Sequence, residues 1–169
     1  MKRVLYPASF DPITNGHINI INRASKIFDN VVIAIMDNPN KKSFLLKEDR
    51  LNIIKKIFNN NPNVEVIIGS GATIDVCKNN NCNCILRGLR SSIDFENEKV
   101  LDYYNKELSN DEIETVYLMS DRELEFISSS AVKELFNLKK DISKYVPNEV
   151  LEILNLQKRA WHYPYFWYT

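Results

Sequence analysis

Glycine is scarce in this chain, and its scarcity bears on two common kinds of nucleotide site. Only four of the 169 residues are glycine: Gly16, Gly69, Gly71 and Gly88. A phosphate-binding loop of the form Gly-x-x-x-x-Gly-Lys-Ser/Thr cannot be built from them, nor can the Gly-x-Gly-x-x-Gly turn of dinucleotide-binding folds. The sequence therefore disfavours kinase-like P-loop sites and dinucleotide sites.

Cysteine and histidine are also rare. The three cysteines, Cys77, Cys82 and Cys84, are an odd number, and nothing at the N-terminus resembles a signal peptide, which argues against a disulfide framework. Zinc needs about four ligands, and the two histidines, His17 and His162, are far away in sequence. We therefore expect reduced, partly buried thiols and no metal site.

Two further absences bear on location and partners. No apolar run approaches the roughly 20 residues that span a bilayer. The 22 Lys and Arg residues are balanced by 22 Asp and Glu residues, so no overall basic field favours nucleic acid. We expect a cytoplasmic protein that binds neither membranes nor nucleic acid and that holds any phosphate ligand with local cations.

The sequence does contain short apolar runs that alternate with segments of helical periodicity. This pattern is typical of a doubly wound parallel α/β sheet with a Rossmann-like arrangement. Strands are expected at residues 3–7, 31–36, 64–68, 84–87 and 115–119, and the intervening segments are expected to be helical. The longest helix, about residues 91–108, carries Phe95, Leu101, Tyr104 and Leu108 on one side. We expect one domain, residues 1–160, followed by an aromatic C-terminal tail, residues 161–169.

The strongest indication of a site lies between the first strand and the first helix. Residues 6–17 read Tyr-Pro-Ala-Ser-Phe-Asp-Pro-Ile-Thr-Asn-Gly-His. A helix that begins near Gly16 points its free N–H groups and positive dipole end back toward the strand tip, which suits a phosphate. His17, in the first helical turn, can reach the same anion. The alternative is a plain connection with an N-capping Thr14 and a surface histidine.

Other cations and hydroxyl groups follow later strands. Lys41 comes after the second strand, Arg87 and Arg90 stand at the end of the fourth, and three serines, residues 128–130, open a helix after the fifth. Ligands of such sheets bind beyond the carboxyl ends of the strands, so we expect these groups to gather there, as a transfer between phosphates requires. The alternatives are a solvated lysine pair, ion pairs between the arginines and the acidic residues that follow, and a helix N-cap.

Several spaced motifs resemble one known family. Residues 6–17 are similar to the first signature of the nucleotidyltransferase superfamily, (His/Thr)-x-Gly-His after a strand and Phe-Asp-Pro, and Ile-Ser-Ser-Ser at residues 127–130 followed by Lys133 resembles the second. Bacterial phosphopantetheine adenylyltransferases carry similar residues at three further places. These are Lys41, the Arg-Gly-Leu-Arg run at 87–90, and the Asp-Phe-Glu run at 94–96 with Glu98. The resemblance covers residues 2–157.

This resemblance implies transfer of AMP from ATP to 4′-phosphopantetheine, giving dephospho-coenzyme A and pyrophosphate, with Mg²⁺ as cofactor and a homohexameric assembly. It implies catalytic roles for His17 and Lys41. The residues implied for phosphopantetheine are Ser9, Lys41, Thr73 and Arg87. Those implied for ATP are Ser9, Phe10, His17, Gly88, Leu89, Arg90, Glu98, Leu124, Glu125, Phe126, Ile127, Ser128, Ser129 and Ser130.

The chain departs from the family pattern in places, and two other functions stay open. In the family, glycine is common at the position of Ala8, threonine at that of Ser9 and a larger apolar residue at that of Thr73. Tyrosine is common at the position of Asn97, and tryptophan at that of Leu124. One alternative is a related transferase that uses nicotinamide mononucleotide or glycerol 3-phosphate as acceptor. The other is a nucleotide-binding module without turnover.

Overall fold

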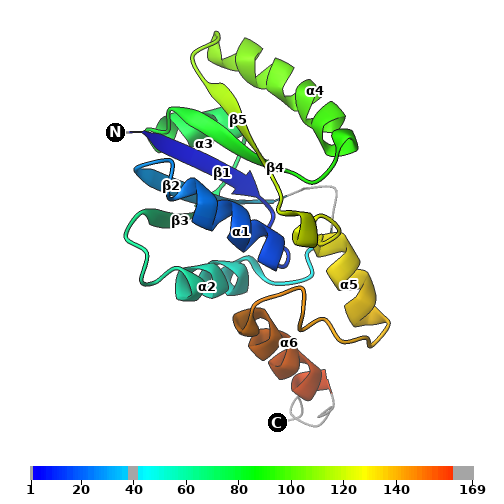
Figure 1. Ribbon diagram of the computed structural model, residues 1–169. Helices are drawn as coiled ribbons and strands as arrows, with labels where there is room; N and C mark the ends of the chain where they lie inside the picture. Colours follow the sequence, from blue (N-terminus) through cyan, green and yellow to red (C-terminus); the bar gives the residue numbers. More distant parts are fainter. Residues whose placement is uncertain (1, 38–41, 162–169) are drawn as a thin grey trace.

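The computed structural model describes residues 2–37 and 42–161, with side chains as far as residue 156. Five strands form one parallel sheet in the order β3-β2-β1-β4-β5 (Figure 1). They are β1 (Arg3–Ala8), β2 (Asn30–Met36), β3 (Val64–Gly69), β4 (Cys84–Leu89) and β5 (Glu114–Met119). The doubly wound sheet of five parallel strands predicted from the sequence is confirmed.

Helices connect the strands and follow the last strand. They are α1 (Asn15–Ala24), α2 (Lys47–Ile57), α3 (Thr73–Asn79), α4 (Ser92–Ser109), α5 (Ser129–Asn137) and α6 (Asn148–Trp161), with a 3-10 turn, η1 (Arg122–Leu124). In the described part of the chain, no helix has both the length and the apolar character that a membrane crossing requires. The aromatic tail predicted for residues 161–169 lies outside the described side chains.

The two faces of the sheet build separate cores. Neighbouring residues of a strand point to opposite faces, so Val4 packs with α1, α2, α5 and α6, whereas Leu5 packs with α3. Most strand positions in the middle of the sheet are thereby covered, and Val31 to Ile35 of β2 are all fully buried. This is the physical reason why continuous apolar runs identified the strands.

The order of the strands reverses between β1 and β4. β1 pairs with β2 along its whole length, but it pairs with β4 only through Val4–Cys84 and Leu5–Ile85. The carboxyl halves of β1 and β4 are therefore not joined by ladder hydrogen bonds. A crevice at this point, beyond the carboxyl ends of the strands, is the usual ligand site of an open α/β sheet.

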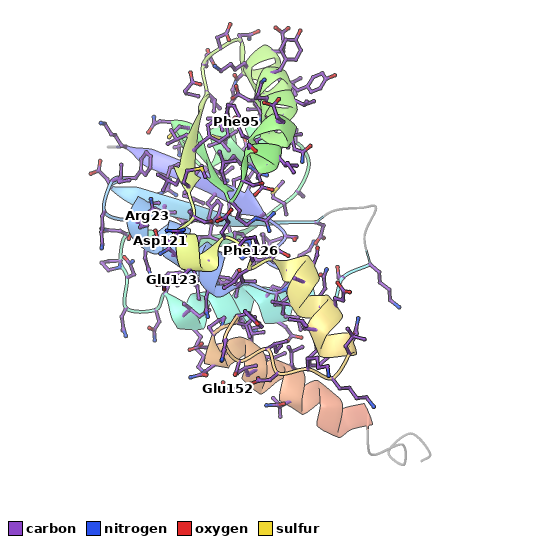
Figure 2. All side chains as sticks on the ribbon, turned by 45° about the vertical axis from the view of Figure 1, so that its right-hand side comes forward. Arg23, Phe95, Asp121, Glu123, Phe126 and Glu152 are labelled. Atoms are coloured by element: carbon purple, nitrogen blue, oxygen red, sulfur yellow. The ribbon has the colours of Figure 1, made fainter. Side chains whose placement is uncertain are left out.

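Helix α4 differs from the others because its apolar side chains are not in either core. Only Ser109 of α4 is buried. Phe95, Leu101, Tyr104 and Leu108 are between 40% and 64% exposed, and Figure 2 shows Phe95 on this helix. We call the exposed apolar residues of this helix the α4 surface: Ile93, Phe95, Val100, Leu101, Tyr103, Tyr104 and Leu108.

Candidate active site

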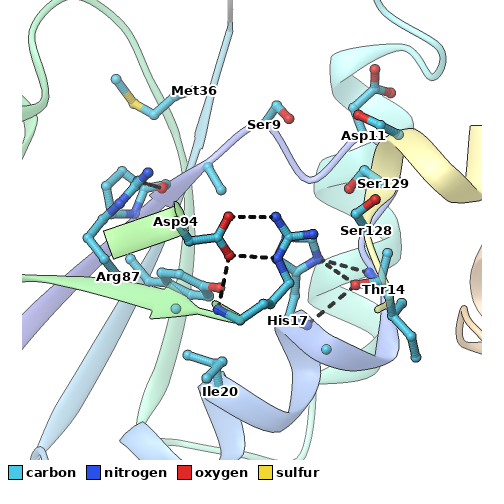
Figure 3. Close-up of a pocket in the computed structure, with 18 of the residues that line it drawn as sticks. Ser9, Asp11, Thr14, His17, Ile20, Met36, Arg87, Asp94, Ser128 and Ser129 are labelled. Atoms are coloured by element: carbon cyan, nitrogen blue, oxygen red, sulfur yellow. Dashed lines mark hydrogen bonds and ion pairs between the residues drawn. The ribbon is translucent and has the colours of Figure 1, made fainter. Parts of the chain in front are cut away.

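A pocket of about 520 Å³ lies at the carboxyl edge of the sheet. Its wall is formed by the ends of β1, β2 and β4 together with the first turns of α1 and α5 (Figure 3). Elements that are far apart in the chain therefore meet at one place. This is the edge at which the sequence predicted that cations and hydroxyl groups would gather.

The first turn of α1 is a capping box in which His17 takes the place usual for glutamate. Thr14 is the N-cap: its hydroxyl accepts a hydrogen bond from the His17 N–H at 3.5 Å, and its own N–H donates to His17 Nδ1 at 3.1 Å. These reciprocal bonds hold the imidazole in one orientation. The plain alternative, an N-capping Thr14, is thus correct, but His17 lines the pocket as the site hypothesis requires.

The protonation state of His17 follows from these contacts. Burial, together with the positive charges of Arg90 and Arg87, lowers the pKa of His17 from 6.5 to about 4. The ring is therefore neutral near pH 7. Because Nδ1 accepts the Thr14 N–H, the ring proton resides on Nε2. His17 consequently offers the pocket a neutral N–H donor on a rigid support.

Two arginines line the pocket, each held by a carboxylate of α4. Arg87 donates from Nη1 to the carbonyl of Pro7 at 2.8 Å, and from Nε and Nη2 to the two oxygens of Glu98 at 2.7 and 2.5 Å. Arg90 donates from Nε and Nη2 to Asp94 at 2.9 and 3.0 Å. The ion pairs that the sequence offered as an alternative are therefore present. They lie inside the pocket wall, where they orient both guanidinium groups.

The three serines at the start of α5 have different partners. Ser128 is the N-cap and accepts from the Ala131 N–H at 3.1 Å, while Ser129 donates to the Pro12 carbonyl at 2.8 Å. Ser130 is exposed in the pocket wall. The N-cap alternative thus holds for Ser128, and the Ser129 bond joins the two signature segments.

Most of the residues implied by the sequence meet in this pocket. Those that line it are Ser9, His17, Thr73, Arg87, Gly88, Arg90, Glu98, Ile127, Ser128, Ser129 and Ser130. Lys41 lies outside the described residues, although its neighbour Lys42 lines the pocket.

Five implied residues are not part of the pocket lining. The side chains of Phe10 and Leu89 are buried in the core, at 1% and 5% exposure. Residues 124–126 lie at η1 and just after it, and Phe126 is 87% exposed (Figure 2). The backbone carbonyl of Leu124 faces the first turn of α1. Of this segment, the structure brings a backbone atom close to the first turn of α1, and residue types do not reveal such backbone contacts.

The structure also brings in residues that were not predicted as part of the site. Asp37, Arg50 and Ser120 line the pocket. A sequence signal for Arg50 existed, because Arg50 lies on the same face of α2 as the buried Ile53 and Ile54. A charged residue in such an apolar stripe is rarely buried unless it has a partner, so its position indicates a specific contact. Asp37 follows β2 directly and had no comparable signal.

The carboxylates that line the pocket all have protein partners. Asp11 accepts from backbone N–H groups, Asp37 is paired with Arg50 and Lys47, and the carboxylates of α4 hold the two arginines. Among the described residues, no group of three or more His, Cys, Asp or Glu side chains is placed to hold a metal ion.

Comparison with known proteins shows to which family the chain is similar. The Cytidylyltransferase-like family matches residues 5–135. The phosphopantetheine adenylyltransferase of Finegoldia magna is 45% identical over 150 residues, which are 89% of this chain and 92% of that protein. The enzymes of that name from Nautilia profundicola and Streptococcus pneumoniae are 41% and 44% identical, over 90% and 92% of this chain and 98% and 96% of theirs.

The chain belongs to the phosphopantetheine adenylyltransferase family. The recognition from the two signatures is confirmed, and so is its classification as a nucleotidyltransferase enzyme. In this member of the family, the first signature supplies the capping box of α1 and the second supplies the first turn of α5. The family match covers both signature segments, since it runs from residue 5 to residue 135.

Gly16 tests whether the first turn of α1 receives a ligand. A Cβ at Gly16 meets no described protein atom closer than 3.5 Å, so the fold does not require glycine there. We expect Gly16→Ala to leave stability unchanged or raise it by up to about 1 kcal/mol, because alanine favours helix. If ATP binds at this turn, the added methyl should raise its KM about tenfold by overpacking the pocket. Urea unfolding and initial-rate kinetics measure both; a normal KM would place ATP elsewhere.

Proposed function

We propose that the pocket transfers AMP from ATP to 4′-phosphopantetheine and releases dephospho-coenzyme A and pyrophosphate. The observation that carries this proposal is the neutral Nε2–H of His17, held at a helix N-terminus in one pocket with Arg87 and Arg90. N–H donors and guanidinium groups of this kind stabilise the charge that develops on a phosphoryl group in transfer. Family membership supplies the choice of substrates.

The acceptor needs no general base. The second pKa of a phosphate monoester is about 6, so phosphopantetheine is largely a dianion near neutral pH and can attack the α-phosphorus directly. His17 would then donate from Nε2 to the α-phosphate as charge builds on it. Lys41 would neutralise phosphate charge as a mobile ammonium group. The protein contributes position and charge, and no covalent bond to it is required.

The assignment of residues follows the resemblance. Ser9, Lys41, Thr73 and Arg87 would hold phosphopantetheine. The residues proposed for ATP are Ser9, Phe10, His17, Gly88, Leu89, Arg90, Glu98 and the segment 124–130. Mg²⁺ would enter on the ATP phosphates and keep most of its waters, as it commonly does. This fits a pocket whose described carboxylates are already paired.

The test of this proposal is pyrophosphate release with ATP and Mg²⁺ when acceptors are offered one at a time. Phosphopantetheine, nicotinamide mononucleotide and glycerol 3-phosphate are compared, and the products are identified by mass spectrometry. Dephospho-coenzyme A from the first acceptor alone is the expected result. Turnover with another acceptor would replace the substrate, and ATP binding without any turnover would favour a binding module.

We also propose that the chain assembles with copies of itself, as a hexamer, through the α4 surface. Seven apolar side chains exposed together on one helix are more than a monomer usually shows, and such a patch typically marks an interface. Sedimentation is expected to give six copies of the 19.7 kDa chain. Leu101→Asp should dissociate the assembly. Lys99→Gln makes the same charge change on the same helix, but Lys99 is two residues from Leu101 and therefore on the opposite side, so this variant should not dissociate it. A wild-type monomer at high concentration would contradict this.

The expected location is the cytoplasm. Cys77, Cys82 and Cys84 are free thiols, two of them buried, and free thiols fit a reducing compartment.

A further inference from the structure

The turn between β1 and α1 contains a residue in an unfavourable backbone conformation. Phe10 has a φ of 47°, in the left-handed region, and its side chain is only 1% exposed. For a bulky residue other than glycine this conformation costs about 1–3 kcal/mol and persists only where the surroundings impose it. Something next to Phe10 must therefore hold the turn.

Both neighbours of Phe10 are fixed by buried charged groups. The carbonyl of Ser9 accepts a hydrogen bond from Arg50 Nη1 at 2.8 Å. The carboxylate of Asp11 accepts from the N–H groups of Phe44 and Leu45 at 2.9 and 2.8 Å. The side chains of Arg50 and Asp11 are 3% and 8% exposed, so water does not compete for these bonds. The peptide group before Phe10 and the side chain of the residue after it are thus both held in place.

The conformation of the turn determines where two site residues stand. The ring of Phe10 meets the ring of His17 edge-on at a centroid distance of 5.2 Å and that of Tyr6 at 5.5 Å. Ser9, directly before it, is exposed and lines the pocket. If Phe10 relaxed to negative φ, its ring would leave the imidazole and the Ser9 hydroxyl would turn away from its present direction.

The contacts of Arg50 are not those expected of a residue that serves only the stability of the fold. Its Nη2 donates to Asp37 at 3.1 Å, but Asp37 is 44% exposed and also pairs with Lys47. The Nε of Arg50 is buried and has no partner among the described residues. An incompletely paired buried guanidinium contributes little net stability compared with an apolar side chain of the same size. Its distinctive contact is the one to the Ser9 carbonyl.

We propose that Arg50 is a positioning residue for adenylyl transfer: through the Ser9 carbonyl it keeps Phe10 left-handed and thereby places Ser9 and His17. This role rests on the proposed function for its effect on rate, but the placement itself is a property of the folded chain. A residue that only supported the fold would affect stability and leave the rate of the folded enzyme alone. The two roles therefore predict different measurements.

The test compares Arg50→Met with Lys47→Gln. Both substitutions are on α2, both remove one positive charge, and both remove a partner of Asp37, but only the first removes the bond to Ser9. We expect kcat of folded Arg50→Met to fall about 10- to 100-fold, as misplaced reacting groups commonly cause, and that of Lys47→Gln to stay within about twofold. Methylguanidinium, but not methylammonium, should restore part of the kcat of Arg50→Ala.

A second measurement does not depend on turnover. The NMR signal of the His17 ring, assigned with His17→Gln, should move in Arg50→Met as the Phe10 ring leaves it, and should not move in Lys47→Gln. If Arg50→Met does not fold, Arg50→Gln replaces it, since its shorter side chain keeps a polar end but does not reach as far toward the Ser9 carbonyl as the guanidinium does. Unchanged kcat with an unmoved His17 signal overturns the proposal. A wild-type chain that lacks turnover overturns the proposed function, while the His17 signal still tests the placement.

Discussion

Replacing His17 with alanine is expected to lower kcat by about 100- to 1000-fold, the usual effect of removing one donor that acts on the transition state. The KM values for ATP and phosphopantetheine should change much less, because the Nε2–H is proposed to act mainly as charge develops. Steady-state kinetics with both substrates varied measure these quantities. A near-normal kcat would remove His17 from the mechanism.

His17→Gln separates the chemical role from the capping role. The amide oxygen of glutamine can accept the Thr14 N–H as the ring nitrogen does, so the first turn of α1 should keep its stability. The single amide group cannot also place a donor where Nε2 lies. We therefore expect wild-type stability and a kcat as low as that of His17→Ala. A glutamine variant with restored kcat would show that capping, and not donation, is what the reaction needs.

The low pKa of His17 has consequences for both stability and rate. Because it is about 4 in the folded chain against 6.5 for a free ring, the unfolded chain binds the proton first as pH falls. The stability that depends on neutral His17 is complete above pH 6.5 and is lost as pH falls through about 4. The kcat/KM for phosphopantetheine should fall below about pH 6 because the acceptor gains a proton. A loss controlled by His17 near neutral pH would contradict the neutral donor.

Replacing Arg87 with methionine is expected to affect stability and catalysis together. Glu98, with a side chain only 15% exposed, loses both of its hydrogen-bonding partners on Arg87, which should cost about 2–3 kcal/mol. The kcat/KM for phosphopantetheine should fall about 100-fold or more, because a phosphate loses its guanidinium partner. Denaturant unfolding and initial rates measure the two effects.

The double variant Arg87→Met/Glu98→Met distinguishes the two effects. Removing both partners leaves no unpaired carboxylate, so stability should return to within about 1 kcal/mol of wild type. The kcat/KM for phosphopantetheine should stay low when it is measured at saturating ATP, a condition needed because Glu98 is itself proposed to bind ATP. If activity returned together with stability, Arg87 would be a structural residue, and the ordinary ion-pair interpretation of this side chain would be the correct one.

The sequence predicted the sheet well because burial on both faces imposes a continuous apolar pattern. The run Val31 to Ile35, for example, is apolar throughout and forms a fully buried strand. The sequence also predicted where the side chains of the site gather, because Ser9 follows β1, Arg87 lies near the end of β4 and the serines 128–130 come after β5, and parallel strands end at one edge. It did not predict that α4 stays outside the cores, because Leu101 and its neighbours have the periodicity of a buried face whatever covers them.

The contacts inside the site could not be predicted, because they depend on which residues come close in space, and the sequence does not give these distances. Arg87 is far in sequence from Pro7, and only the short β1–β4 ladder makes their bond possible. Arg50 lies one helical turn before Ile53 and Ile54 on the buried face of α2, and its role became visible only with the strained turn at Phe10. Asp37 follows a strand like many loop residues, and nothing in its sequence context distinguishes it.

The central claim is direct attack of the acceptor phosphate on the α-phosphorus of ATP, with position and charge supplied by the protein. It is tested by a single turnover with phosphopantetheine and ATP made chiral at the α-phosphorus by sulfur substitution. Inversion of configuration in the dephospho-coenzyme A product is the predicted result, because one displacement occurs. Retention would contradict it, since two displacements through an adenylylated residue would then be required.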